Sequence, residues 1–265
     1  MQIAITHKTR YSFQDQVSFG LQQLRTTPRG TRGQAVLEWS TEVEGGQTEA
    51  AFQDHHGNAV RLISFAAGVT ELEIVSRGSV ALSDDTGVVG PHRGPAPLWL
   101  YQRETPLTKP GAGVRALLRR IEGETPLDQM HSAMALIAGE VRYEIGASSP
   151  DWDAETVLEE GKGVCQDHSH VFLAVARALG LPARYVSGYL RLEDRVDQVA
   201  MHAWAEAHVP DLGWVGFDVS NGISPDQRYV RVATGLDYAE AAPVIGSRVG
   251  GAGEALDVAI QVAEQ

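Results

Sequence analysis

One stretch of the chain, GKGVCQDH at residues 161–168, holds the only cysteine of the 265-residue sequence, Cys165. An apolar run from Val171 to Leu179 follows it with the spacing of a helix. The cysteine therefore lies where that helix is expected to begin, and free backbone N–H groups there favour a negative charge. The glycines at 161 and 163 permit a tight turn that leaves the helix start open.

Two downstream motifs supply partners for such a thiol. They are HAWAE at residues 202–206 and GWVGFD at residues 213–218, which place His202 in one expected strand and Asp218 at the end of the next. A free thiol has a pKa near 8.5 and is mostly neutral at pH 7, so an imidazolium beside it would favour the thiolate. A carboxylate on the second ring nitrogen would hold the imidazole in one orientation. Together these are the parts of a cysteine nucleophile.

Each of the three residues also has a structural interpretation. A free cysteine often behaves as a small buried hydrophobic residue. His202 alone would most simply be a satisfied structural histidine, and Asp218 alone a cap at a strand end or turn. Their joint occurrence, with glycines and the polar run at 166–168 around the cysteine, favours the nucleophile.

The region from about 154 to 222 resembles the core of the transglutaminase-like superfamily of papain-like cysteine enzymes. The resemblance is carried by the three motifs above and by LGLPARYVSGY at residues 179–189. The preceding region resembles the β module found before this core in a bacterial subgroup. Its markers are HKTRY at 7–11, LRTTPR at 24–29 and DHHGN at 54–58, and the tail at 230–244 also fits that subgroup. The resemblance thus spans nearly the whole chain.

The resemblance implies a reaction and assigns roles within it. Cys165 would be the nucleophile, His202 the general base and acid, and Asp218 the residue that orients the ring. The thiolate would attack an amide carbonyl, and the resulting thioester would pass to water or to an amine, as in cysteine proteases, other hydrolases and acyltransferases. The implied substrate is a peptide, a protein or a glutamine-like side chain, and this chemistry requires no cofactor.

A tetrahedral intermediate needs hydrogen-bond donors for its oxyanion, and the backbone N–H of Cys165 is the first candidate. No motif fixes the second donor. Tyr143, Gln166 and Trp204 are candidates, although a structural role is favoured for each. Trp204 lies two residues from His202 on the same side of a strand, so it could line a substrate cleft.

The hydrophobic pattern predicts an α+β protein with two parts. Residues 1–95 are expected to form an all-β, sandwich-like module, and residues 96–265 a core of helices packed on an antiparallel sheet, with a C-terminal strand that could return to the module. The expected strands of the module are 2–13, 18–27, 35–43, 49–54, 59–66 and 70–81, and residues 87–97 are an expected linker. The expected helices are 113–122, 127–143, 156–159 and 164–179, and the later strands are 183–191, 203–209, 214–219, 229–233 and 255–263.

The composition indicates which binding partners and which cellular compartment are expected. The chain is 43% hydrophobic and carries a formal net charge of −12, so no general attraction to nucleic acid or to an anionic membrane is expected. Basic residues at 115–120 most simply form the solvated face of a helix. The N-terminus alternates like a strand and lacks a signal-peptide core, and one cysteine cannot form an internal disulfide. We therefore expect a cytoplasmic protein, with its oligomeric state left open.

Two other classes of function compete with the enzyme. One is a non-catalytic binding or scaffold protein on the same fold. The other is a metal-dependent hydrolase that uses the Asp167-His168-Ser169-His170 run with His208. Positions 168 and 170 of a helix project about 200° apart, so their rings do not readily converge, and we expect no catalytic metal. His55 and His56 are expected in a hairpin turn.

Overall fold

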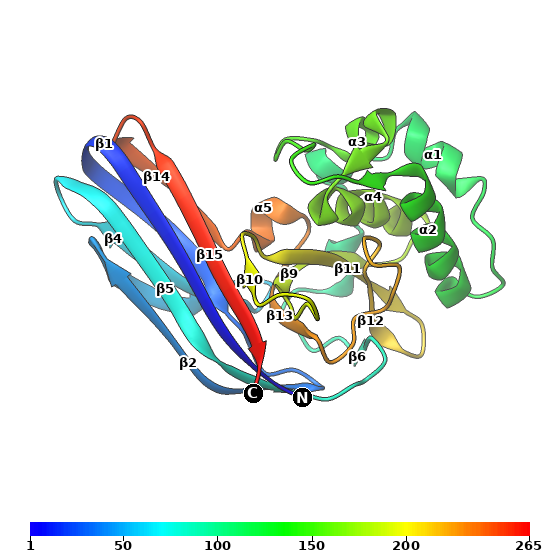
Figure 1. The fold of residues 1–265 in the computed structure, drawn as a ribbon. Coiled ribbons are helices and arrows are strands. Elements are labelled where there is room, and N and C mark those ends of the chain that lie inside the picture. Colours follow the sequence, from blue (N-terminus) through cyan, green and yellow to red (C-terminus); the bar gives the residue numbers. More distant parts are fainter.

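An eight-stranded sheet packs beside a five-stranded sheet with helices on one face in the computed structural model, which describes residues 1–265 (Figure 1). We call the first the large sheet and the second, with its helices, the helical unit. The predicted α+β class, with helices packed on an antiparallel sheet in a papain-like core, is confirmed. None of the helices is both long and apolar enough to cross a membrane.

The large sheet is organised around its first strand. Its strands are β1 (Gln2–Thr27), β2 (Gln34–Glu44), β3 (Gly46–Gln53), β4 (Ala59–Phe65), β5 (Val69–Leu82), β10 (Asp197–Gln198), β14 (Val244–Gly250) and β15 (Ala255–Glu264). The first half of β1 pairs with β5 and β15, and its second half pairs with β4 and β14. The pairing register shifts between Ser12 and Val17. The sequence predicted two strands here, but the chain continues through the irregularity as one long strand.

The two halves of the large sheet curl around a small core of their own. Side chains from both halves of β1 and from β4 and β5 meet in one buried cluster, which includes Tyr11, Leu24, Ile63 and Leu72. The predicted sandwich-like module is therefore a single curled sheet. Burying side chains of this size contributes roughly 1.5–3 kcal/mol each.

Both ends of the chain contribute to the large sheet. The last strand, β15, pairs antiparallel with residues 3–12 of β1, and β14 pairs with residues 17–24. The sequence pattern did not predict β14, whose exposed segment contains Gly246 and Gly250 and lacks a continuous apolar face. A Cβ at Gly246 would come within 2.2 Å of the Leu21 carbonyl oxygen, so a glycine is needed for the close pairing.

The helical unit follows in the middle of the chain. Its helices are α1 (Ala112–Leu118), α2 (Pro126–Glu140), α3 (Ala154–Glu160), α4 (Cys165–Ala178) and α5 (Tyr238–Ala241), with 3-10 turns η1 (Leu98–Gln102) and η2 (Pro106–Thr108). Its sheet has the order β13 (Tyr229–Gly235), β9 (Ala183–Leu190), β11 (His202–Val209), β12 (Gly213–Phe217) and β6 (Val88–Gly90), and a two-stranded pair joins β7 (Arg142–Tyr143) to β8 (Lys162–Gly163). In Figure 1, helices α1–α4 lie above the five-stranded sheet and to the right of the large sheet.

Two predicted boundaries differ from the structure. The expected linker at 87–97 contains β6, which pairs with β12. The helix expected to end at Tyr143 ends at Glu140, because Val141 is already extended and the next two residues pair in parallel with β8. Tyr143 is therefore a strand residue beside the segment that leads into α4.

A single core cluster joins the large sheet to the helical unit. It includes Ile3, Ile5, Ile260 and Val262 from the large sheet together with the buried side chains of α4. Period-2 alternation explains this, because every second residue of β1 and of β15 faces the helical unit. The large sheet thus completes the core on which the site is built.

Candidate active site

Cys165 is the first residue of α4, and the chain before it is shaped by two glycines. Gly161 ends α3 in the left-handed conformation, with φ at 61°. A Cβ at Gly163 would come within 2.7 Å of the Asp167 side chain. That carboxylate accepts the Val164 N–H at 2.6 Å and the Ser148 hydroxyl at 2.9 Å, which fixes the first turn of α4. The thiol is left half-buried at the helix start.

His202 and Asp218 are brought together by neighbouring strands. His202 opens β11, and Asp218 follows the last residue of the paired strand β12. The His202 Nε2 lies 2.6 Å from Asp218 Oδ2. The two side chains are 12% and 1% exposed, so the contact is shielded from water.

The Asp218 carboxylate is held by two further residues. Its Oδ2 accepts the Asn221 side-chain amide at 2.7 Å and the Tyr229 hydroxyl at 2.8 Å, and its Oδ1 accepts the Asn221 backbone N–H at 3.2 Å. Burial alone would raise the pKa of Asp218, but the hydrogen bonds and charge of His202, with those of Asn221 and Tyr229, lower it. The buried carboxylate is therefore kept ionised.

Cys165, at the start of α4, also affects the charge of His202. Burial acts to lower the pKa of His202, but hydrogen bonds to Asp218 and to Cys165 outweigh it and raise that pKa well above 6.5. Since Asp218 occupies Nε2, the ring nitrogen left for the sulfur is Nδ1. The structure thus places Cys165 in the same cleft as His202, whose ring is hydrogen-bonded to Asp218. Such an arrangement can hold a thiolate–imidazolium pair and pass a proton to or from a group at the sulfur.

The thiol and the imidazole open into one cleft of about 650 Å³. Tyr143 and Gln166, two of the three candidates for the second oxyanion donor, line this cleft. The Tyr143 side chain is about half exposed, and the partial burial raises its pKa, so the hydroxyl stays protonated and can donate.

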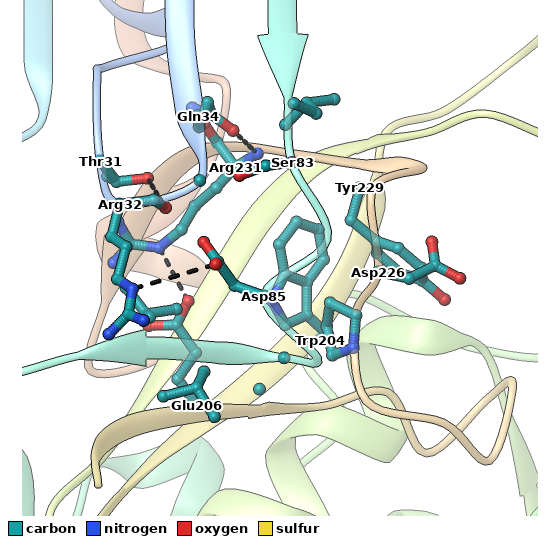
Figure 2. Close-up of a pocket in the computed structure, with 17 residues that line it drawn as sticks. Thr31, Arg32, Gln34, Ser83, Asp85, Trp204, Glu206, Asp226, Tyr229 and Arg231 are labelled. Atoms are coloured by element: carbon teal, nitrogen blue, oxygen red, sulfur yellow. Dashed lines mark hydrogen bonds and ion pairs between the residues drawn. The ribbon is translucent and has the colours of Figure 1, made fainter. Parts of the chain in front are cut away.

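The sequence interpretation of Trp204 as a residue of the substrate cleft is wrong, because Trp204 does not line the cleft that holds Cys165. It is 3% exposed and lines a separate small pocket with Glu206 and Tyr229 (Figure 2). The expected alternation of β11 is correct, but further along the strand this face of the sheet is covered by other parts of the chain. The indole packs against the rings of both His202 and Tyr229, with centroids 6.2 and 5.4 Å away, and so supports the imidazole.

Sequence reasoning missed Asn221, Tyr229 and Ser148. The signal for Asn221 is its place three residues after Asp218, within reach of a turn. Neither Tyr229 nor Ser148 belongs to a local pattern, since Tyr229 comes from another strand and Ser148 lies 19 residues before the carboxylate that it contacts.

The histidines of α4 do not gather around a common point. The two ring nitrogens of His168 contact the Ser220 hydroxyl at 2.8 Å and the Val141 carbonyl at 2.9 Å. His170 accepts the Tyr238 backbone N–H through Nε2 at 3.2 Å. Both side chains are buried and join α4 to the surrounding loops, as expected for residues that pack a helix.

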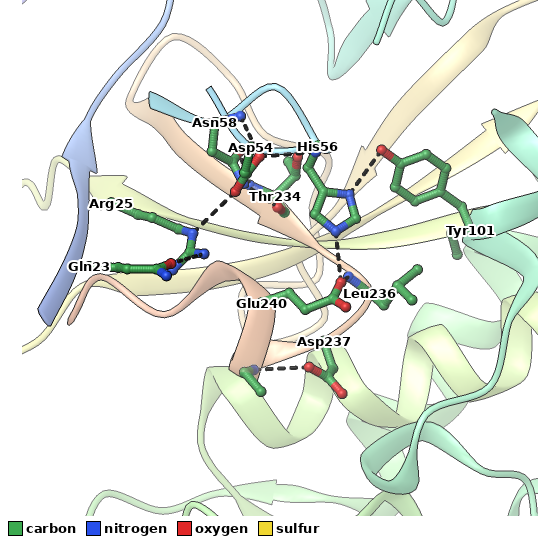
Figure 3. A network of polar contacts seen from close by, with 12 residues as sticks. Gln23, Arg25, Asp54, His56, Asn58, Tyr101, Thr234, Leu236, Asp237 and Glu240 are labelled. Carbon is green, nitrogen blue, oxygen red and sulfur yellow. Dashed lines mark hydrogen bonds and ion pairs between the residues drawn. The ribbon is translucent and has the colours of Figure 1, made fainter. Parts of the chain in front are cut away.

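The turn at residues 54–58, which we call the linking turn, joins β3 to β4 as a hairpin and also contacts the helical unit (Figure 3). The buried ring of His56 contacts the Tyr101 hydroxyl at 3.1 Å and the Glu240 carboxylate at 2.7 Å. His55, His56 and Glu240 bring three metal-ligand atoms within 4.8 Å of one another. However, both ring nitrogens of His56 already have protein partners, so the arrangement is explained as a link between the two parts.

Comparison with known proteins supports what this geometry suggests. Residues 115–219 match the transglutaminase-like superfamily, and residues 3–81 match the bacterial transglutaminase-like N-terminal region. The chain combines a transglutaminase-like core with that N-terminal region. The predicted resemblance is thereby confirmed.

The chain is also similar to individual proteins. An uncharacterised protein of Mycobacterium leprae is 26% identical over 97% of both chains. The crystal structure of a candidate cysteine protease from Cytophaga hutchinsonii superimposes with a TM-score of 0.80 at 20% identity, covering 99% of this chain and 90% of that one, and so shares its fold. A protein-glutamine gamma-glutamyltransferase of Pseudomonas aeruginosa is 30% identical over 35% of this chain and 14% of its own length.

Proposed function

We propose that the protein is a thiol-dependent acyl-transfer enzyme that acts at amide bonds of a peptide, a protein or a glutamine-like side chain. The Cys165 thiolate attacks the carbonyl carbon, and the carbon–nitrogen bond breaks as the His202 imidazolium gives its proton to the leaving amine or ammonia. A thioester remains. Water or a second amine then attacks it, the neutral imidazole takes the proton of that nucleophile, and the sulfur leaves as a thiolate.

The observation that carries this proposal is the position of the His202 ring between Asp218 and Cys165. The ring is hydrogen-bonded to Asp218 and shares the cleft with Cys165, and both neighbours act to raise its pKa. The transglutaminase-like core supports the general kind of reaction, as does the similarity of about a third of the chain to a glutamyltransferase. The assignment of hydrolysis or of transamidation depends on which acceptor reaches the thioester.

The oxyanion of the tetrahedral intermediate would be stabilised from the start of α4. The backbone N–H of Cys165 has no partner one helical turn earlier, as for every first residue of a helix. Tyr143 and Gln166 line the same cleft and are the proposed sources of a second donor. A cytoplasmic location, and the lack of nucleic-acid and membrane partners, stay predictions from the sequence.

The proposal is tested by alkylation of the single thiol. We expect iodoacetamide to label the native protein at pH 7 faster than the same protein unfolded in urea, and the Cys165→Ala variant to take up no label and to lose amide cleavage. Intact-mass spectrometry follows the label directly. Equal rates for the native and unfolded protein would contradict the proposal and favour a non-catalytic binding protein.

A further inference from the structure

The cleft that holds Cys165 is lined by both parts of the molecule. The helical unit provides the reactive residues, and the large sheet provides residues of β1, β14 and β15. The cleft of about 650 Å³ is in the range that holds a ligand of several residues, and it is larger than one glutamine side chain needs.

The wall from the large sheet follows from the alternation of β1. Ile3 and Ile5 face the helical unit and are buried in the joint core. The next residues on the same face, His7, Thr9 and Tyr11, line the cleft. The joint core therefore ends where the cleft begins, and β1 contributes residues to both.

Its partner strand β15 repeats this arrangement with apolar side chains. Ile260 and Val262 are in the joint core, whereas Val258 and Leu256 line the cleft. Leu256 lies opposite Tyr11 in the ladder and is 54% exposed. A large aliphatic side chain that is exposed in the same cleft as the reactive thiol points to an apolar ligand.

Two further residues of the cleft have exposed aliphatic side chains. Ile145 and Val199 line the cleft and are 78% and 81% exposed. Apart from the reactive pair, the only lining residues with a permanent charge are Arg195 and Asp197, which have opposite signs and lie two positions apart. The cleft therefore has no excess of charge that would select an acidic or a basic substrate.

The histidine in the wall is also uncharged. His7 is buried, with its ring nitrogens 2.9 Å from the Tyr189 hydroxyl and 3.2 Å from the Thr9 hydroxyl. Burial lowers its pKa to about 4, so it is neutral at physiological pH.

We propose that this cleft binds an uncharged, apolar peptide segment, with the large sheet contacting its side chains while the scissile carbonyl lies at Cys165. The proposal rests on the proposed function for the position of the carbonyl, but binding of the peptide does not require a reactive thiol. It assigns the large sheet a role in substrate selection and makes Leu256 a specificity-determining residue.

Binding to the Cys165→Ala variant tests the proposal independently of the chemistry. The probes are two pools of fluorescein-labelled decapeptides, one randomised over Ala, Val, Leu, Phe and Ser, and the other with Glu or Lys at alternate positions. Fluorescence anisotropy should show tighter binding of the uncharged pool. Adding Leu256→Asp should weaken that binding by about tenfold or more, since a carboxylate then replaces an apolar contact.

A matched control is Leu37→Asp in β2, which is 53% exposed in the same sheet but lies outside the cleft, and which should leave binding unchanged. Equal binding of the two pools, or equal effects of the two substitutions, would overturn the proposal. With Cys165 intact and no peptide present, iodoacetamide alkylation of the Leu37→Asp variant should proceed at the wild-type rate, so the reactive thiol is assayed separately from peptide binding. Thus a failure of alkylation counts against the proposed function, and a failure of peptide selection counts against this inference alone.

Discussion

At the scale of single residues, the buried carboxylate of Asp218 is the group on which the charge state of the site depends. Removing a carboxylate from water is costly, and the hydrogen bonds from His202, Asn221 and Tyr229 offset that cost. The order of the motifs, together with the family resemblance, was enough to predict the pair of His202 and Asp218. Of the supporting residues, Asn221 had a signal in its place three residues after Asp218, whereas Tyr229 was not predictable, because it reaches the carboxylate from another strand.

Replacing Asp218 by alanine should change the pH dependence of the thiol reaction. The native His202 has a raised pKa, so its imidazolium form persists above pH 6.5 and supports the thiolate there. Without the carboxylate, the pKa of His202 should fall back toward 6.5 or below. Burial, which lowers this pKa, is then opposed only by the contact to Cys165. The rate of iodoacetamide alkylation at pH 7 should drop roughly tenfold or more, and the two proteins should converge near pH 10, where a free thiol is ionised.

Asp226→Ala is the control for this substitution. Asp226 is a nearby carboxylate, but it contacts Arg228 and not the imidazole. Its removal should leave the pH profile of alkylation as in the wild type. An Asp218→Ala profile that matches the wild-type curve would show that the carboxylate does not control the charge of His202.

At the scale of elements, the start of α4 was largely predictable from the sequence, whereas several strands were not. The glycines, the cysteine and the apolar run all lie within one short segment, so local rules suffice. The end of α2 was misplaced because Val141 continues the helical apolar pattern, and only pairing with β8, about 20 residues later, makes this segment extended. The strand β14 depends in the same way on β1, at the other end of the chain.

The two glycines before α4 should respond differently to alanine. Gly161→Ala places a side chain at a left-handed φ but meets no atom closer than 3.6 Å, so it should cost about 1 kcal/mol of stability and leave alkylation unchanged. Gly163→Ala forces the Asp167 carboxylate away from the Val164 N–H, so it should lower stability by about 1–2 kcal/mol and also slow alkylation.

Urea unfolding and iodoacetamide labelling of both variants separate these effects. The two substitutions are chemically identical and two residues apart, so each serves as the control of the other. If Gly161→Ala slowed alkylation as much as Gly163→Ala, the cap made by Asp167 would not be what positions the cysteine.

At the scale of the whole molecule, the large sheet and the helical unit are stabilised by the same core. The joint cluster contains side chains from β1, β5 and β15 as well as from α4 and β11, and the linking turn adds hydrogen bonds at a second place. The termini lie close together at one end of the strands of the large sheet (Figure 1). Neither part therefore keeps its full core when the other unfolds, and we expect them to unfold together.

Asn58→Ala tests this coupling. The Asn58 side chain accepts the Thr234 N–H at 2.8 Å and donates to the Thr234 carbonyl at 2.7 Å, so its loss leaves two buried backbone groups of β13 without partners. We expect the free energy of unfolding to fall by about 2–4 kcal/mol.

The urea transitions of this variant, followed by circular dichroism and by tryptophan fluorescence, should shift together. The control is His55→Ala, in the exposed part of the same turn, which should shift neither transition. Two separate transitions, or a shift in only one of them, would show that the parts are stable independently. In that case the large sheet could leave the cleft without unfolding the residues around Cys165.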